Sequence, residues 1–279
     1  MTETAENIRP LANLLSGDEL QAYAQDGIVV PDYQLSADHL LSLRSTLDRL
    51  LKDNPGIRPE RLVSAHIEGR NAEGVRGSAD FLALARDKGI VDRVSQLIGD
   101  DVILWGCQIF CKPGGDGMAV PWHQDGHYWP IRPLATCTVW VALDDSSVEN
   151  GCLRVVPGSH RHRQLQPHLR DAREDIVLNQ RLDDALVDEG CARAIELKAG
   201  QMSMHDVYLV HGSHANRSAR RRAGVAIRYM PGTSLLDRGP QHSGAASGYL
   251  VDFSSRPLWL LRGRDRTGRN NFQLGHPTD

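Results

Sequence analysis

The chain has 279 residues, of which 41% are hydrophobic and 24% are charged, as is ordinary for a globular protein, and one all-β domain can reach this length. The net charge of −3 gives no reason to expect nucleic acid or a membrane surface as a partner. No apolar run approaches the ~18 residues of a membrane-spanning helix. The five cysteines show no C-x-x-C spacing. We therefore expect reduced thiols and a cytoplasmic protein.

The first hundred residues carry helical patterns. They begin without the basic and apolar segments of a signal peptide. Ser16, with Glu19 three residues later, predicts a capping box at the start of a helix that leads into the strand-like "GIVV". Ser36 is a candidate N-cap for a stronger helix, in which leucines recur at spacings of three and four. Residues 78–99 predict one or two more helices, so we expect residues 1–100 to form a helical flank.

From about residue 101 the pattern changes to short apolar runs separated by Gly, Pro, Asn and Asp. Such runs are typical of strands in a sandwich or barrel, so we predict a mostly β fold with flanking α-helices. Residues 101–232 would form the core, and residues 233–279 a C-terminal extension of the same single domain, 1–279. The polar stretch 160–190 interrupts the strands and is either a solvated excursion or a lid over a site.

The run "PWHQDGHYWP" places His123 and Asp125 two positions apart, in a chain with only 5% aromatic residues. If the strand before them reaches this point, the two side chains point to the same face and can hold two corners of one metal ion. A His-x-Asp pair arises often by chance, so this interpretation requires a third ligand elsewhere in the chain.

Three later histidines compete for that role: His205, His211 and His214. We favour His211, because it follows the apolar run "VYLV" and precedes "GS", which allows a close backbone approach. His205 and His214 would then lie outside the first ligand shell or at the surface.

Two imidazoles and one carboxylate leave open coordination positions, an arrangement suited to non-haem Fe(II) and O2 chemistry. Zinc hydrolases more often use His-Glu-x-x-His, which does not occur here. Such an iron needs a co-substrate, and 2-oxoglutarate could chelate it. A buried arginine would have to bind its far carboxylate, and Arg222, eleven residues after His211, is the candidate within the run "RSARRR". We expect the other arginines of that run to be solvated.

The segments "WHQDGHYWPIRPLATCTVWVALDDSSVENGCLRVVPGSH" and "HGSHANRSARRR" resemble the phytanoyl-CoA dioxygenase family of Fe(II)- and 2-oxoglutarate-dependent oxygenases. Weaker similarity extends over nearly the whole chain. The resemblance implies a double-stranded β-helix, the cupin-like jelly roll, with the N-terminal helices packed on the major sheet. It also implies hydroxylation of an unactivated C–H bond in a small organic molecule, with release of succinate and CO2.

The resemblance also assigns site residues. It implies metal ligation by His123, Asp125 and His211 and places Arg222 on the distal carboxylate of 2-oxoglutarate. It places Trp140 and Gln108 beside this co-substrate, and Ser213 is a further candidate hydrogen-bond donor. Related halogenases lack the carboxylate ligand, so the intact Asp125 favours hydroxylation.

Several alternatives stay open at this point. The same site could catalyse desaturation, epoxidation or ring closure, or the chain could be a cupin-like metal protein without 2-oxoglutarate turnover, or a binding jelly roll. The family does not determine the substrate. An inward-pointing Arg154 or Arg228 would favour an acidic substrate, and the oligomeric state is undetermined.

Overall fold

The computed structural model of the protein describes residues 14–242 and 251–276. The described chain is mostly β, with antiparallel sheets and four α-helices, which confirms the predicted class. Most of the N-terminal stretch in which a signal-peptide pattern is missing lies outside these ranges. None of the described helices is both long and apolar enough to cross a membrane.

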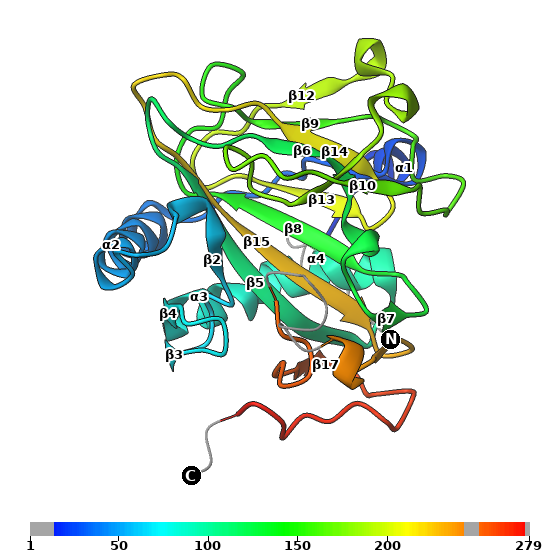
Figure 1. Cartoon of the computed structure of the whole chain (residues 1–279). Coiled ribbons are helices and arrows are strands. Elements are labelled where there is room, and N and C mark those ends of the chain that lie inside the picture. The colour runs from blue at the N-terminus through cyan, green and yellow to red at the C-terminus, as the bar shows by residue number, and fades with distance from the viewer. Residues whose placement is uncertain (1–13, 243–250, 277–279) are drawn as a thin grey trace, which may run out of the picture.

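The larger sheet has seven strands and runs through the middle of the molecule (Figure 1). Its order is β1–β13–β8–β15–β5–β17, with β2 also paired to β5, and every pairing is antiparallel. Strands distant in sequence are therefore neighbours in space. The bounds are β1 Ile28–Val29, β2 Leu62–Val63, β5 Val102–Lys112, β8 Cys137–Ala142, β13 Met202–Asp206, β15 Arg222–Pro231 and β17 Trp259–Arg262.

A second antiparallel sheet, above the larger one in Figure 1, has the order β12–β9–β14–β6. Three two-stranded ladders lie outside these two sheets. The second sheet consists of β6 Val120–Gln124, β9 Leu153–Val155, β12 Arg193–Ile195 and β14 Val210–Ser213. The ladders pair β3 Gly69–Arg70 with β4 Arg76–Gly77, β7 Ile131–Arg132 with β16 Leu235–Leu236, and β10 His168–Arg170 with β11 Gln180–Leu182.

The helices begin where the sequence predicts. Ser16 caps α1 in a complete capping box with Glu19, and Ser36 accepts a hydrogen bond from the backbone N–H of His39 at the start of α2. The stretch after residue 78 forms two helices, of which α4 packs on β5, β8 and β15 and α3 on β5. The bounds are α1 Gly17–Asp26, α2 Ala37–Asp53, α3 Ala79–Ala85 and α4 Lys88–Ile98, with 3-10 turns at Pro59–Arg61, Asp125–His127, Asp184–Leu186, Glu189–Cys191 and Pro240–His242.

Strand β15 separates the main core from a cavity. Its odd-numbered residues are apolar and buried in the largest hydrophobic cluster, which α2, α3 and α4 also join; they are Ala223, Val225, Ile227 and Tyr229. Its even-numbered residues Arg222, Ala226 and Arg228 line the cavity on the opposite face. This alternation follows from the two-residue period of a strand, and it directs two arginines of one strand to the same side.

The stretch 160–190 is folded against the second sheet. It contains the β10–β11 hairpin, and β11 packs on β6. Ile176, Val177 and Leu182 are buried, while Leu178 and Asn179 line the cavity. The stretch is therefore not simply a solvated loop, and part of it covers the cavity.

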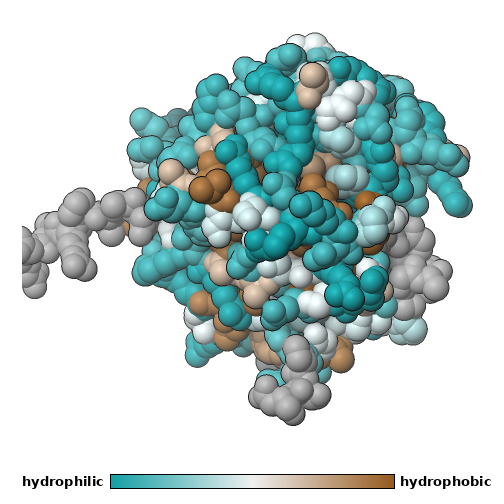
Figure 2. Space-filling view, turned by 90° about the vertical axis from the view of Figure 1, so that its left-hand side faces the viewer, coloured by the Kyte–Doolittle hydropathy of each residue, from teal (hydrophilic) through white to brown (hydrophobic). Residues whose placement is uncertain are grey.

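The face shown in Figure 2 is mostly hydrophilic, with small separate apolar patches. Exposed apolar side chains such as Leu41 on α2 and Val148 do not belong to the core clusters. All five cysteines are free thiols and Cys191 is the exposed one, as the reduced-thiol interpretation predicts. Burial raises the thiol pKa of Cys107 and of Cys137 to about 12, so both are protonated and inert at neutral pH.

Candidate metal centre and its cavity

Three side chains converge at one buried point. His123 is on β6, Asp125 opens the 3-10 turn directly after it, and His211 is on β14. One ligand atom from each residue lies within 4.8 Å of the other two. Since β6 and β14 are paired with His123 opposite His211, the two imidazoles are cross-strand neighbours, with ring centroids 4.1 Å apart. The strand ends at Gln124, so Asp125 reaches the site from a turn rather than from the strand itself.

Backbone carbonyls orient both imidazoles. Nδ1 of His123 lies 2.9 Å from the carbonyl oxygen of Pro121, and Nδ1 of His211 lies 2.9 Å from that of Leu209. Each Nδ1–H therefore donates to a carbonyl, which leaves the Nε2 lone pair free to face Asp125, at 3.6 and 3.9 Å from Oδ1. This tautomer is the one that a divalent metal requires.

The carboxylate is also held in place. The Thr138 hydroxyl on β8 donates to Oδ2 of Asp125 at 3.0 Å, and Oδ1 faces the two imidazoles. Burial raises the pKa of Asp125, but contacts with His123 and His205 and the nearby positive charges together outweigh burial and hold this pKa well below its usual range. Burial, followed by the neighbouring His123, lowers the pKa of His211 well below its usual range. Two imidazoles and one carboxylate therefore face one point, and this donor set fits a divalent cation.

The other two candidate histidines lie outside this group. The Nε2 atom of His205, on β13, is 3.4 Å from Oδ2 of Asp125, but neither of its ring nitrogens has a hydrogen-bond partner among the described residues. His214 lies beside the surface residue Arg154, with its Nε2 2.7 Å from the guanidinium. The structure therefore brings His211 to the site, with His205 beside it and His214 turned away.

A cavity of about 1150 Å³, including its open mouth, extends from this centre. Asp125 is the one acidic residue among the described residues that line it. Arg222 and Arg228 belong to the same wall, on β15. The remaining lining is mainly apolar or aromatic, and includes Trp105, Phe110, Val120, Tyr128, Trp129, Trp140, Leu153, Val251 and Phe253.

Arg222 is buried at one end of the cavity. It is 3% exposed; Nη2 donates to the carbonyl oxygen of Gly151 at 2.8 Å, and Nε has no hydrogen-bond partner in the described structure. The guanidinium lies 5.3 Å from the centre of the Trp140 ring. Burial lowers its pKa to about 10, so it is cationic at neutral pH. A buried cation with an unpaired N–H, lining a cavity, is suited to bind a carboxylate.

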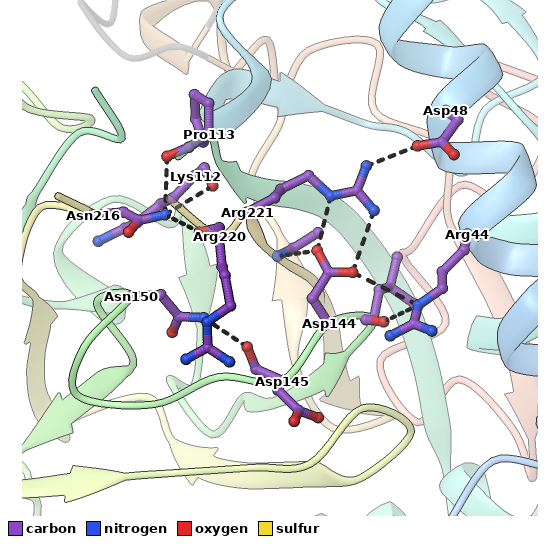
Figure 3. A network of polar contacts seen from close by, with 12 residues as sticks. Arg44, Asp48, Lys112, Pro113, Asp144, Asp145, Asn150, Asn216, Arg220 and Arg221 are labelled. Atoms are coloured by element: carbon purple, nitrogen blue, oxygen red, sulfur yellow. Dashed lines mark hydrogen bonds and ion pairs between the residues drawn. The ribbon is translucent and has the colours of Figure 1, made fainter. Parts of the chain in front are cut away.

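The loop before Arg222 is fastened by its own polar residues (Figure 3). The Asn216 side chain donates to the carbonyl oxygens of Pro113 and Arg220, at 2.9 and 2.7 Å. Arg221 forms ion pairs with Asp144 and Asp48, and Arg220 with Glu149. The neighbouring arginines are therefore held at the outside of the protein, while Arg222 turns inward, as the sequence led us to expect.

The remaining predicted residues lie around Arg222 and the metal centre, and all line the cavity. Trp140 is under Arg222. The Gln108 side chain donates to the carbonyl oxygen of Glu60 at 3.5 Å and accepts from Arg228 at 3.3 Å. Ser213 accepts a hydrogen bond at 2.7 Å from Lys112, a fully buried lysine that the sequence analysis did not single out.

Of the two arginines considered as contacts for an acidic substrate, Arg228 points into the cavity and Arg154 does not. Arg154 pairs with Glu189 at 3.0 Å, while Arg228 lines the cavity. His127 stacks on His168 with centroids 3.9 Å apart, and both His127 and Tyr128 contact Gln180 of β11. These contacts connect the turn that carries Asp125 to the 160–190 stretch.

The comparisons with known proteins agree with this geometry. A model of the family "Phytanoyl-CoA dioxygenase (PhyH)" matches residues 23–224. An ectoine dioxygenase of Streptomyces anulatus is 26% identical over 76% of this chain and 77% of its own length. An L-proline trans-4-hydroxylase of Streptomyces griseoviridis is 26% identical over 85% and 92%, respectively.

Solved structures share the fold. The apo form of the non-heme monooxygenase ThoJ superposes with a TM-score of 0.70 at 23% identity, covering 89% of this chain and 85% of that one. The epimerase SnoN, solved with Fe3+, alpha ketoglutarate and nogalamycin RO, gives a TM-score of 0.63 at 24% identity, covering 82% and 87%. At this level of identity the structural likeness shows the fold alone.

Proposed function

This chain belongs to the phytanoyl-CoA dioxygenase family and is a non-haem, 2-oxoglutarate-dependent oxygenase, and we propose that it holds Fe(II) on His123, Asp125 and His211. The observation that carries the proposal is the convergence of these three side chains in a buried cavity that also contains Arg222. The carbonyl-oriented imidazoles and the ionised carboxylate form the donor set that such an iron requires.

The co-substrate in this proposal lies between the metal and Arg222. The guanidinium binds the distal carboxylate, with its unpaired Nε–H and its Nη groups as donors. Trp140 fixes the plane of the guanidinium, and Gln108 on β5 and Ser213 on β14 supply hydrogen bonds from the two sheets. Fe(II) with 2-oxoglutarate supplies, when bound, the O2-dependent oxidation of an unactivated C–H bond, with release of succinate and CO2.

The residues of this chain orient the metal ligands and exclude water from the site. Thr138 holds one oxygen of Asp125, and the carbonyls of Pro121 and Leu209 prevent the imidazoles from rotating. The aromatic walls keep water away from the reacting carbon. Because Asp125 occupies the carboxylate position, hydroxylation is favoured over halogenation.

Further parts of the proposal concern the whole chain. We assign the two sheets to a double-stranded β-helix, of which the order β12–β9–β14–β6 forms the smaller sheet and carries two of the three ligands. Residues 1–279 would be one domain: a helical flank at 1–100, a core at 101–232, a lid at 160–190 and an extension at 233–279. The partner would be a small organic molecule, and the enzyme would act in the cytoplasm.

Succinate release provides the test. The purified full chain, with Fe(II), 2-oxoglutarate and O2, is incubated with a panel of small metabolites that includes ectoine and L-proline, because relatives act on molecules with these names. We expect succinate formation that depends on one panel member and is lost in His123→Ala. Equal succinate formation by His123→Ala and the unmodified chain would remove the ligand assignment.

A further inference from the structure

The end of the cavity opposite Arg222 contains a second arginine. Arg228 is six residues further along β15 and on the same face, so roughly 20 Å of strand separates the two Cα atoms. Arg228 pairs in register with Thr138, whose hydroxyl holds Asp125. The metal centre therefore lies beside β15 near Arg228, and the proposed co-substrate anchor lies at the other end.

The Arg228 guanidinium has few partners. It donates one hydrogen bond, from Nη2 to Gln108 at 3.3 Å, and its buried Nε has no acceptor in the described structure. It forms no ion pair with any described residue. It lies 5.9 and 5.4 Å from the ring centres of Trp105 and Trp129, and the anion that acts on it is the more distant Asp125 carboxylate, which faces the proposed metal. Burying such a cation costs free energy unless a ligand supplies the missing hydrogen-bond acceptor and negative charge.

A third arginine nearby is already neutralised. Arg256, from the C-terminal extension, is 3% exposed and forms an ion pair with Glu73 at 2.8 Å. It also donates to the Ser64 hydroxyl. Of the two guanidinium groups at this end of the cavity, Arg228 is therefore the one that forms no ion pair with a described residue, and Arg256 is a neighbour already paired with Glu73.

The other side chains that line the cavity near Arg228 indicate the chemical character of the rest of the ligand. Around Arg228 they are the aromatic and aliphatic side chains Trp105, Trp129, Val251 and Phe253. Among the described lining residues, Asp125 is the one acid, and a bound metal would use it. An ammonium group on the ligand would therefore find no counter-ion of its own.

We propose that the substrate is a small monocarboxylate with an apolar body and no ammonium group, and that Arg228 binds its carboxylate. This inference rests on the proposed function, which places 2-oxoglutarate on Arg222 and leaves Arg228 for the substrate. A planar guanidinium can grip a carboxylate with two parallel hydrogen bonds, and the two indoles hold it in one orientation. A substrate held there has its apolar part beside the metal centre.

Calorimetric titration tests the assignment. The full chain is first loaded with Mn(II) and saturating 2-oxoglutarate without O2, so that Arg222 is occupied. It is then titrated with a panel of carboxylates from acetate to phenylacetate, including cyclohexanecarboxylate, together with cyclohexanecarboxamide and cyclohexylammonium, which keep a similar apolar body but change the charge. We expect at least one carboxylate to bind, cyclohexanecarboxylate to bind roughly tenfold or more tightly than the amide, and the ammonium to bind most weakly.

The variant Arg228→Gln should lose roughly tenfold or more of the carboxylate affinity and leave the affinity for the amide unchanged. Arg228→Lys should lose less carboxylate affinity, since the positive charge remains and only the paired N–H donors of the guanidinium are lost. Arg220→Gln is the matched control, because it makes the same exchange at an arginine that pairs with Glu149 at the surface. It should bind every probe as the unmodified chain does.

Two outcomes overturn the inference: no carboxylate binds the loaded chain, or Arg228→Gln binds carboxylates as tightly as the unmodified chain. The loading step separates this failure from failure of the proposed function. If 2-oxoglutarate binds in a metal-dependent way and Arg228→Gln retains that binding and its melting temperature, the inference about Arg228 alone is at stake. If 2-oxoglutarate does not bind, the proposed function fails first.

Discussion

Gly224 lies directly against the Trp140 ring: a Cβ atom built on Gly224 would be 2.0 Å from Cζ2 of the indole. Gly224 is two residues after Arg222 on β15, and the Arg222 guanidinium lies over the same indole. The missing side chain therefore gives Trp140 its place under the arginine. The identity of one strand residue is linked in this way to the geometry of the proposed co-substrate anchor.

Gly224→Ala should displace the Trp140 ring and weaken 2-oxoglutarate binding. We expect a loss of about 1–3 kcal/mol in the free energy of unfolding, typical of overpacking, and a higher 2-oxoglutarate requirement. Chemical denaturation and calorimetry measure the two effects. Gly106→Ala is the matched control for stability, because a Cβ on Gly106, in the adjacent strand β5, would meet its nearest atom at an ordinary 3.8 Å. Equal stability of both variants would contradict the packing argument.

The third metal ligand can be identified by comparing three histidine variants. His211→Ala should abolish Fe(II) binding and substrate-dependent succinate release, because it removes one of the three converging ligands. His205→Ala removes a neighbour of Asp125 and should weaken metal affinity by roughly 10-fold, at the low end of outer-shell effects. His214→Ala should leave it unchanged. Anaerobic metal titration measures all three, and full Fe(II) affinity in His211→Ala would transfer the role to His205.

Arg222→Gln should raise the 2-oxoglutarate requirement by roughly 30-fold or more, because the variant removes a buried charge that binds a carboxylate. Stability without ligand should change little, since the guanidinium has one hydrogen bond and no ion pair in the described structure. The dependence of succinate release on 2-oxoglutarate concentration measures the effect. An unchanged dependence would remove Arg222 from the co-substrate site, because Arg220 and Arg221 are engaged in ion pairs outside the cavity.

The metal-free protein should lose stability on acidification from about pH 6.5 to pH 4. Burial, with a contribution from the nearby His127, lowers the pKa of His168 to about 4, and burial also lowers the pKa values of His66 and His211 well below their usual range. The unfolded chain, with histidine pKa values of about 6.5, then binds more protons than the folded chain, so stability rises with pH in this window. Below the folded pKa of His168 its contribution stops changing.

Urea unfolding at several pH values tests this dependence. His168→Gln should flatten the slope between pH 6.5 and pH 4 by less than about 1.4 kcal/mol per pH unit, because the half-buried imidazole is partly solvated. His162→Gln, at an exposed position, is the control and should leave the slope as it is. A slope in His168→Gln equal to that of the unmodified chain would show that this side chain does not contribute.

Local patterns predicted much of the molecule. The capping box at Ser16 and the N-cap at Ser36 depend on contacts within one helical turn, so residues three apart in sequence are enough to predict them. The adjacency of His123 and Asp125 is local as well. The sequence also indicated the direction of Arg228. Arg222 and Arg228 are an even number of residues apart on one strand, so both side chains point to the same side. This indicates an inward Arg228 only once Arg222 has been placed inward on other grounds.

Other features required the folded chain. Three histidines lie within ten residues of one another in sequence, and the pairing of β14 with β6 brings His211, rather than His205 or His214, opposite His123. The ion pair of Arg256 with Glu73 joins the C-terminal extension to the β3–β4 hairpin. The buried Lys112 reads in sequence as an ordinary strand residue near a turn. A charge pattern does not show which cations are buried, because burial depends on what packs against them from distant segments.

The sequence by itself determined the chemical donors, the helix starts and the mostly β character, because capping, alternation and side-chain chemistry act over a few residues. The tertiary structure alone decided which donors share one cavity and which arginines line it without an ion pair to a described residue. Those properties depend on the register between strands as far apart as β6 and β14 and on the packing of the C-terminal extension against β5 and the β3–β4 hairpin. Register is a property of strand pairs, and a one-residue slip would turn every side chain to the other face.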